Sequence, residues 1–108
     1  MTGDEVRTWL EAELKSFPDR ATQVEFYGYF LRRVGDVIDT ERPNVVAALA
    51  HWLRSHSEPR TTLALEIAEA YRLDELRPEL ERLLQDVSEG KALLPYYSRY
   101  IRQALDAI

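Results

Sequence analysis

Two sets of apolar residues recur in this sequence about one helical hairpin apart. The first set recurs 31 residues later and the second recurs 34 residues later. The first set, Val45, Leu49, Trp52 and Leu53, returns as Leu76, Leu80, Leu83 and Leu84, and the second set, Leu63, Ile67, Ala70 and Tyr71, returns as Tyr97, Ile101, Ala104 and Leu105. The two sets and their two later copies all follow the i, i+4, i+7, i+8 spacing of one face of an α-helix. This pattern predicts amphipathic helices joined by short turns, and therefore an all-α fold.

Residues that start and stop helices divide the chain into about six predicted helices. Thr2 and Glu5 have capping-box spacing, prolines stand near several expected starts, and Gly90 ends the fifth helix. The expected helices cover residues 2–14, 16–38, 40–55, 57–71, 74–87 and 95–108. No segment alternates with a period of two, so we expect no strands. No linker divides the chain, so residues 1–108 are predicted to form a single domain.

The hairpin pattern resembles the helical repeats of HEAT-like and armadillo-like proteins. The resemblance covers residues 43–108 approximately and rests on two helices, 63–71 and 97–108, with alanine at the close-packed position. The Asp and Arg positions that mark a HEAT repeat are missing. The resemblance implies helical hairpins stacked side by side, each burying its apolar face against its neighbour. The alternative architecture is an irregular six-helix bundle.

Charge and cysteine content narrow the classes of function. The chain has 14 Lys and Arg against 19 Asp and Glu, and the net charge of −5 weakens attraction to nucleic-acid phosphates and anionic lipids. The absence of cysteine excludes disulfides, thiolate catalysis and Cys-ligated zinc. The N-terminal residues do not read as a signal peptide, and no stretch is long enough to span a membrane. We therefore expect a cytoplasmic protein.

Catalytic, metal and cofactor sites have no signature in the sequence. The only histidines, His51 and His56, are five residues apart, or about 140° around a helix, and do not converge on a metal. No phosphate loop, nucleophile elbow or dinucleotide fingerprint occurs. The acidic residues fit solvated helix faces with basic neighbours, for example Glu79 with Arg82 and Glu69 near Arg72. We expect no enzyme activity, no cofactor and no metal.

Two groups of aromatic and arginine residues are the candidate contacts with a partner. The first group, Phe26, Tyr29 and Phe30, lies on the second expected helix, and the second group, Tyr96, Arg99, Tyr100 and Arg102, lies on the last. Aromatic residues on two sides of a helix indicate either a central core helix or an exposed contact surface. Arginine with tyrosine on an exposed flank is the composition of interface hot spots. Arginine outnumbers lysine 12 to 2, which indicates bidentate contacts or compositional bias.

These features predict a protein–protein interaction module, a small adaptor or regulatory subunit. The expected partner is another protein, or a second copy bound through the C-terminal helix, which is apolar to Ile108. The alternative is an acidic inhibitor or immunity-type protein, because acidic charge can cover the active site of a basic enzyme. A second alternative is a HEAT-like nucleic-acid-binding protein, which the net charge disfavours. No membrane partner is expected.

Overall fold

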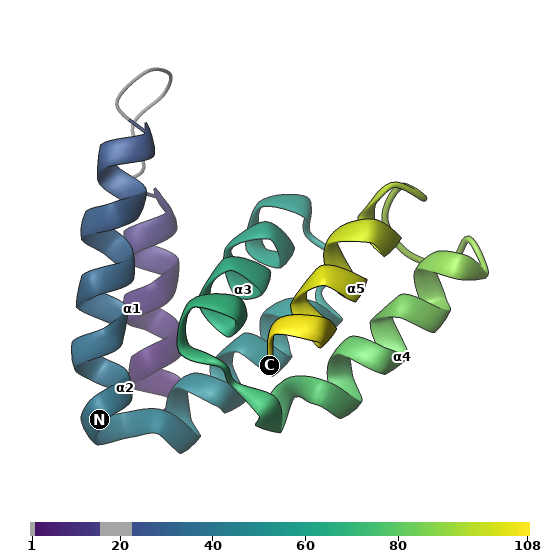
Figure 1. The fold of residues 1–108 in the computed structure, drawn as a ribbon. Helices are drawn as coiled ribbons and strands as arrows, with labels where there is room; N and C mark the ends of the chain where they lie inside the picture. The colour runs from purple at the N-terminus through teal and green to yellow at the C-terminus, as the bar shows by residue number, and fades with distance from the viewer. Residues whose placement is uncertain (1, 16–22) are drawn as a thin grey trace. The chain divides into compact units, whose positions relative to one another are not determined.

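A computed structural model describes residues 2–15 and 23–108, with side chains from Gly28 onward in the second range. These residues form five α-helices and no strand, so the predicted all-α class is confirmed (Figure 1). The helices are α1 (Gly3–Lys15), α2 (Gln23–Arg54), α3 (Glu58–Tyr71), α4 (Arg77–Ser88) and α5 (Tyr97–Ala107), and one turn of 3₁₀-helix, η1 (Asp74–Leu76), precedes α4. The chain divides into two compact units, Met1–Ala48 and Leu49–Ile108. The single domain expected for residues 1–108 stays a prediction.

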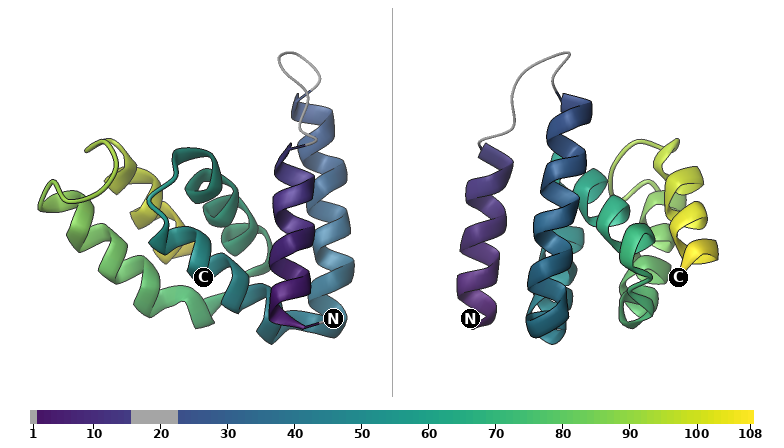
Figure 2. Two further views of the ribbon diagram at one scale, coloured as in Figure 1. Left: turned by 180° about the vertical axis from the view of Figure 1, so that it is seen from behind. Right: turned by 60° about the vertical axis from the view of Figure 1, so that its left-hand side comes forward.

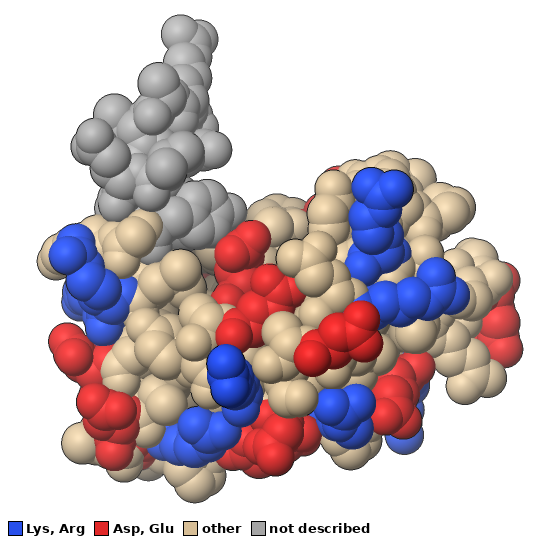
Figure 3. Space-filling model, in the orientation of Figure 1, with Lys and Arg blue, Asp and Glu red and all other residues tan. Residues whose placement is uncertain are grey.

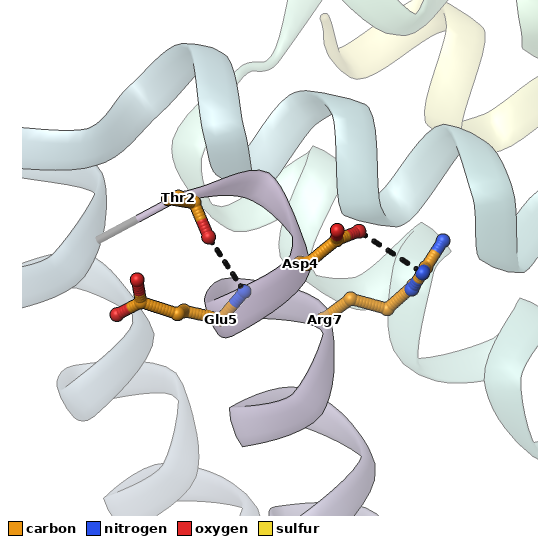
Figure 4. A network of polar contacts seen from close by, with 4 residues as sticks. All are labelled: Thr2, Asp4, Glu5 and Arg7. Atoms are coloured by element: carbon orange, nitrogen blue, oxygen red, sulfur yellow. Dashed lines mark hydrogen bonds and ion pairs between the residues drawn. The ribbon is translucent and has the colours of Figure 1, made fainter.

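Helix α1 begins at the predicted capping residues. The hydroxyl oxygen of Thr2 accepts a hydrogen bond from the backbone N–H of Glu5 at 3.1 Å (Figure 4). Asp4 forms an ion pair with Arg7 one turn later, also at 3.1 Å. The cap satisfies one of the backbone donors that the start of a helix leaves free. Within the first unit, α1 lies antiparallel to the first part of α2 (Figure 2).

The core of the first unit includes one of the predicted partner contacts. Phe30 is fully buried, as are Val34 and, on α1, Val6 and Leu10. The ring of Phe30 stacks on Trp9 with 6.4 Å between centroids. The expectation of Phe30 as a surface contact is therefore wrong. Its spacing of four residues from Val34 places it on the apolar face that packs against α1.

Helix α2 is interrupted by a kink close to the break that the sequence predicts between residues 38 and 40. The backbone of Glu41 leaves helical values (φ −132°, ψ 30°), two residues before Pro43. Proline lacks the N–H of the helical ladder and its ring crowds the carbonyl four residues earlier, which kinks the helix. The Asn44 side-chain amide donates a hydrogen bond to Glu41 at 2.7 Å at this kink. The kink at Glu41 thus separates two helical segments close to the predicted boundary, and the expected start of the first segment near residue 16 lies outside the described residues.

The second unit contains the end of α2 and helices α3, α4 and α5. Helix α5 packs against both α3 and α4 (Figure 1). The buried residues of α3 are Thr61, Leu63, Ala64, Leu65, Ile67 and Ala68. The repeated apolar positions are mostly buried, but Ala70 is exposed whereas Ala104 is fully buried. The close-packed alanine expected in both copies therefore occurs only in the second, because the packed face of α3 carries Ala64 and Ala68.

Local signals end the helices of the second unit. Gly90 adopts a left-handed conformation (φ 75°) after α4, and the Lys91 N–H donates to the Asp86 carbonyl at 2.8 Å. This is the expected glycine stop. The Arg77 guanidinium donates to the carbonyls of Leu105 and Ile108 at 3.2 and 3.3 Å, so α4 caps the end of α5. The end of α5 is thus held within its own unit, and the expected contact with a second copy stays a prediction.

Replacement of Thr61 by valine should stabilise the protein. Thr61 is fully buried, and its hydroxyl oxygen has no hydrogen-bond partner among the residues that the structure describes. Removing a buried, unsatisfied hydroxyl should raise the free energy of unfolding by about 1 kcal/mol, measured by urea denaturation. The matched control is Thr62→Val, whose hydroxyl lies 3.4 Å from the Tyr97 hydroxyl and should not stabilise. A loss of stability in Thr61→Val would contradict this account.

Candidate functional site

A groove of about 430 Å³ lies between α3 and α5 in the second unit. Its lining residues are Thr62, Leu65, Glu66 and Glu69 of α3, and Tyr96, Tyr97, Tyr100 and Gln103 at and beyond the start of α5. Each group follows the spacing of one helix face, which is why residues distant in the sequence share one surface. We call this surface the tyrosine groove.

Three tyrosines form the α5 side of the tyrosine groove. The rings of Tyr96 and Tyr97 stack with 4.9 Å between centroids, and Tyr100 meets both edge to face at 6.1 Å. Tyr97 is buried, and its hydroxyl lies 3.4 Å from that of Thr62, which joins α5 to α3. Tyr96 and Tyr100 are 53% and 47% exposed. The cluster therefore fixes two large aromatic side chains at the surface, where little conformational entropy remains to be lost on binding.

The α3 side of the groove is acidic. Glu66 and Glu69 lie one turn apart, and neither has an ion pair or hydrogen bond in the part of the chain that the structure describes. Partial burial raises the pKa of Glu69, and the charge of Glu66 adds to this rise. Partial desolvation, followed by the effects of Tyr97 and Glu58, also raises the pKa of Tyr96. Figure 3 shows acidic side chains gathered over α3. Both shifts indicate that the groove disfavours additional negative charge.

The predicted contacts on the last helix separate into two kinds. Tyr96 and Tyr100 line the tyrosine groove. Arg99 and Arg102 are exposed on α5 but do not line the groove. The expected shared flank of tyrosine and arginine is therefore divided: the tyrosines line the groove beside α3, and the arginines are exposed outside it.

The predicted contacts on α2 also differ from one another. Tyr29 is 50% exposed in the first unit, and the Arg33 guanidinium lies 5.6 Å from the centre of its ring. Phe30 is a core residue, as described above. Phe26 belongs to α2, but its side chain lies outside the described residues.

Sequence reasoning missed the acidic half of the groove. Glu69 was expected beside Arg72, but Arg72 follows the last residue of α3 with a left-handed backbone (φ 49°) and leaves the helix face. Glu66 has no basic residue three or four positions away. The lack of basic residues beside these two glutamates could have indicated the acidic side of the groove. A carboxylate on a solvated helix face usually has a basic neighbour in a chain this rich in arginine.

A second hollow of about 180 Å³ lies beside α4. Its lining residues are Leu53, Arg54, His56, Glu79, Arg82, Leu83 and Asp86. Arg54 and Glu79 form an ion pair across it, so Glu79 pairs with Arg54 rather than with Arg82 as expected. Hydrogen bonding to Glu79, and then its charge, raise the pKa of Arg54. Because the main charges of this hollow already neutralise each other, we take the tyrosine groove as the candidate site.

Within the described ranges, no three His, Asp or Glu side chains are grouped in a way that would hold a metal ion. In these ranges no helix is long and apolar enough to cross a membrane. Comparison with protein-family models finds no match, and no curated protein and no solved structure is significantly similar to this chain.

Proposed function

We propose that this chain is a protein-interaction module whose tyrosine groove binds a positively charged segment of another protein. One observation carries the proposal: Glu66 and Glu69 have no cation among the described residues, and they stand beside the half-exposed rings of Tyr96 and Tyr100. A cation in this groove can form charge-assisted hydrogen bonds with the carboxylates and cation–π contacts with the aromatic faces.

The free energy for binding would come from three sources. A bound cation neutralises two carboxylates that lie one turn apart. It thereby offsets both causes that raise the pKa of Glu69, which are partial burial first and the charge of Glu66 second. It also lies against the electron-rich faces of the tyrosines. Covering the groove removes apolar surface of Tyr96 and Tyr100 from water. A tyrosine-rich contact of this kind is typical of protein interfaces.

The overall charge supports a basic protein partner. At a net charge of −5, long-range attraction speeds encounters with a basic surface and slows those with nucleic acid. An inhibitor or immunity-type role uses the same groove and differs only in that the partner is a basic enzyme. A nucleic-acid-binding role has less support, since Arg99 and Arg102 lie outside the groove and the groove itself is acidic.

The architecture also carries a proposal. We propose that residues 45–71 and 76–105 are divergent copies of one HEAT-like hairpin. The support is the burial of matching residues: Leu49 and Leu80 are both fully buried, and so are Ile67 and Ile101. The two copies differ in burial at two matched pairs: Ala70 is exposed whereas Ala104 is buried, and Leu53 is buried whereas Leu84 is partly exposed.

The proposal is tested by titrating the protein with a short Gly-Ser peptide that carries two lysines and two arginines. We expect a dissociation constant of about 10–100 μM, and nuclear magnetic resonance shifts concentrated in α3 and α5 around the tyrosine groove. Raising the salt from about 50 to about 200 mM should weaken binding several-fold. The same peptide with glutamate at the four positions is the control and should not bind. Shifts confined to other surfaces, or no shifts, would contradict the proposal.

A further inference from the structure

In the first unit, one arginine side chain is bound by two aromatic rings and a carboxylate, the same kinds of group that line the tyrosine groove. The Arg33 guanidinium lies 5.5 Å from the ring centre of Trp9 and 5.6 Å from that of Tyr29. It also forms an ion pair of 2.5 Å with Glu13, a carboxylate that is only 8% exposed. Two aromatic faces and one largely buried glutamate thus fix a single arginine side chain.

The tyrosine groove offers the same groups without the cation. Its exposed aromatic side chains are Tyr96 and Tyr100, and its carboxylates are Glu66 and Glu69. Neither carboxylate has a partner among the described residues. Two arginines of the second unit have partners outside the groove: Arg54 forms an ion pair with Glu79, and Arg77 donates hydrogen bonds to the end of α5.

The chemistry of the groove favours arginine over lysine. Glu66 and Glu69 present four carboxylate oxygens within one helical turn, and a guanidinium has five N–H donors in one plane, whereas an ammonium has three around a point. The flat guanidinium also stacks on a tyrosine ring while keeping its edge free to donate hydrogen bonds.

We propose that the tyrosine groove recognises an arginine side chain of a partner protein, stacked on Tyr96 or Tyr100 and hydrogen-bonded to Glu66 and Glu69. This inference rests on the proposed function, since it specifies which cation the groove binds. The partner segment presents the arginine with at least one neighbouring residue in the groove, because about 430 Å³ exceeds the volume of one side chain.

The test compares three peptides that share a neutral Gly-Ser sequence and differ at two positions, which are arginine, lysine or citrulline. Citrulline keeps the shape of arginine and removes its charge. We expect the arginine peptide to bind at least about tenfold more tightly than the lysine peptide, and the citrulline peptide not to bind detectably, as measured by calorimetry at low salt. Tyr100→Leu should reduce the preference for arginine over lysine, and Tyr100→Phe should retain it, because phenylalanine keeps the ring face.

Each outcome separates the two proposals. Equal binding of the arginine and lysine peptides would overturn the arginine inference and leave the proposed function standing. Failure of both charged peptides would overturn both proposals, and so would citrulline binding as tightly as arginine. Sedimentation at the same protein concentrations should show monomers. A dimer that dissociates when the arginine peptide is added would place a second copy of this chain in the groove, and would overturn the assignment to a separate partner.

Discussion

Replacement of Trp52 by alanine is expected to lower the free energy of unfolding by about 3–5 kcal/mol. Trp52 is fully buried and is among the largest side chains in the core, together with Leu49 and Leu53 on the same helix. Removing the indole gives up its transfer free energy and leaves a cavity that the surrounding helices fill only in part. The expected loss is a large share of the stability of a small domain. Urea denaturation followed by far-ultraviolet circular dichroism measures it.

Two further variants control for the position of Trp52. Trp52→Phe keeps a ring in the core and should cost clearly less than the alanine variant. His51→Ala changes the neighbouring exposed residue of the same helix and should alter stability by less than about 0.5 kcal/mol. A loss below about 1 kcal/mol in Trp52→Ala would show that the second unit does not depend on this side chain.

The double variant Glu66→Gln/Glu69→Gln is expected to weaken binding of the arginine peptide by about 30-fold or more. The amide side chains keep the shape of the groove but remove the negative charge from the groups that accept hydrogen bonds from the arginine. Charge-assisted hydrogen bonds are about twice as strong as neutral ones. Glu81→Gln is the matched control, because Glu81 is exposed on α4 and does not line the groove. Unchanged affinity in the double variant would remove these carboxylates from the binding site.

The same double variant should be at least as stable as the parent protein at neutral pH. The pKa of Glu69 is raised by partial burial and by Glu66, so the ionised carboxylate destabilises the folded state above that pKa. The penalty disappears as the pH falls through the raised pKa toward the ordinary value of 4.5. Thermal denaturation should therefore show a difference in midpoint at neutral pH that shrinks near pH 4 or so. A difference that grows on acidification would contradict this sign.

The parts of the fold that were predictable from the sequence are those fixed by neighbouring residues. The cap at Thr2, the start of α3 near Pro59 and the stop at Gly90 each depend on a few adjacent backbone groups. The break expected between residues 38 and 40 occurs at Glu41, two residues before Pro43, and it is a kink between two helical segments of α2. The second segment of α2 then continues from this kink to Arg54.

The candidate site was predictable only in its aromatic half. Tyr96 and Tyr100 share a helix face, which periodicity shows directly. Glu66 and Glu69 join them through the packing of α5 on α3, a tertiary contact between residues about thirty positions apart that no local pattern encodes. Phe30 was wrongly assigned to a contact surface because aromatic residues are common at interfaces. Its spacing of four residues from Val34 instead indicates the core, where both residues are buried.

The most direct test of the central claim is the contact between a bound arginine and the tyrosine rings. Intermolecular nuclear Overhauser effects in the complex with the arginine peptide should connect the side-chain methylene protons of the arginine to ring protons of Tyr96 or Tyr100. The two glutamates should at the same time show the largest shifts of their side-chain carboxyl signals. Overhauser contacts to other residues alone, or a complex in which both tyrosine rings remain unperturbed, would contradict the account.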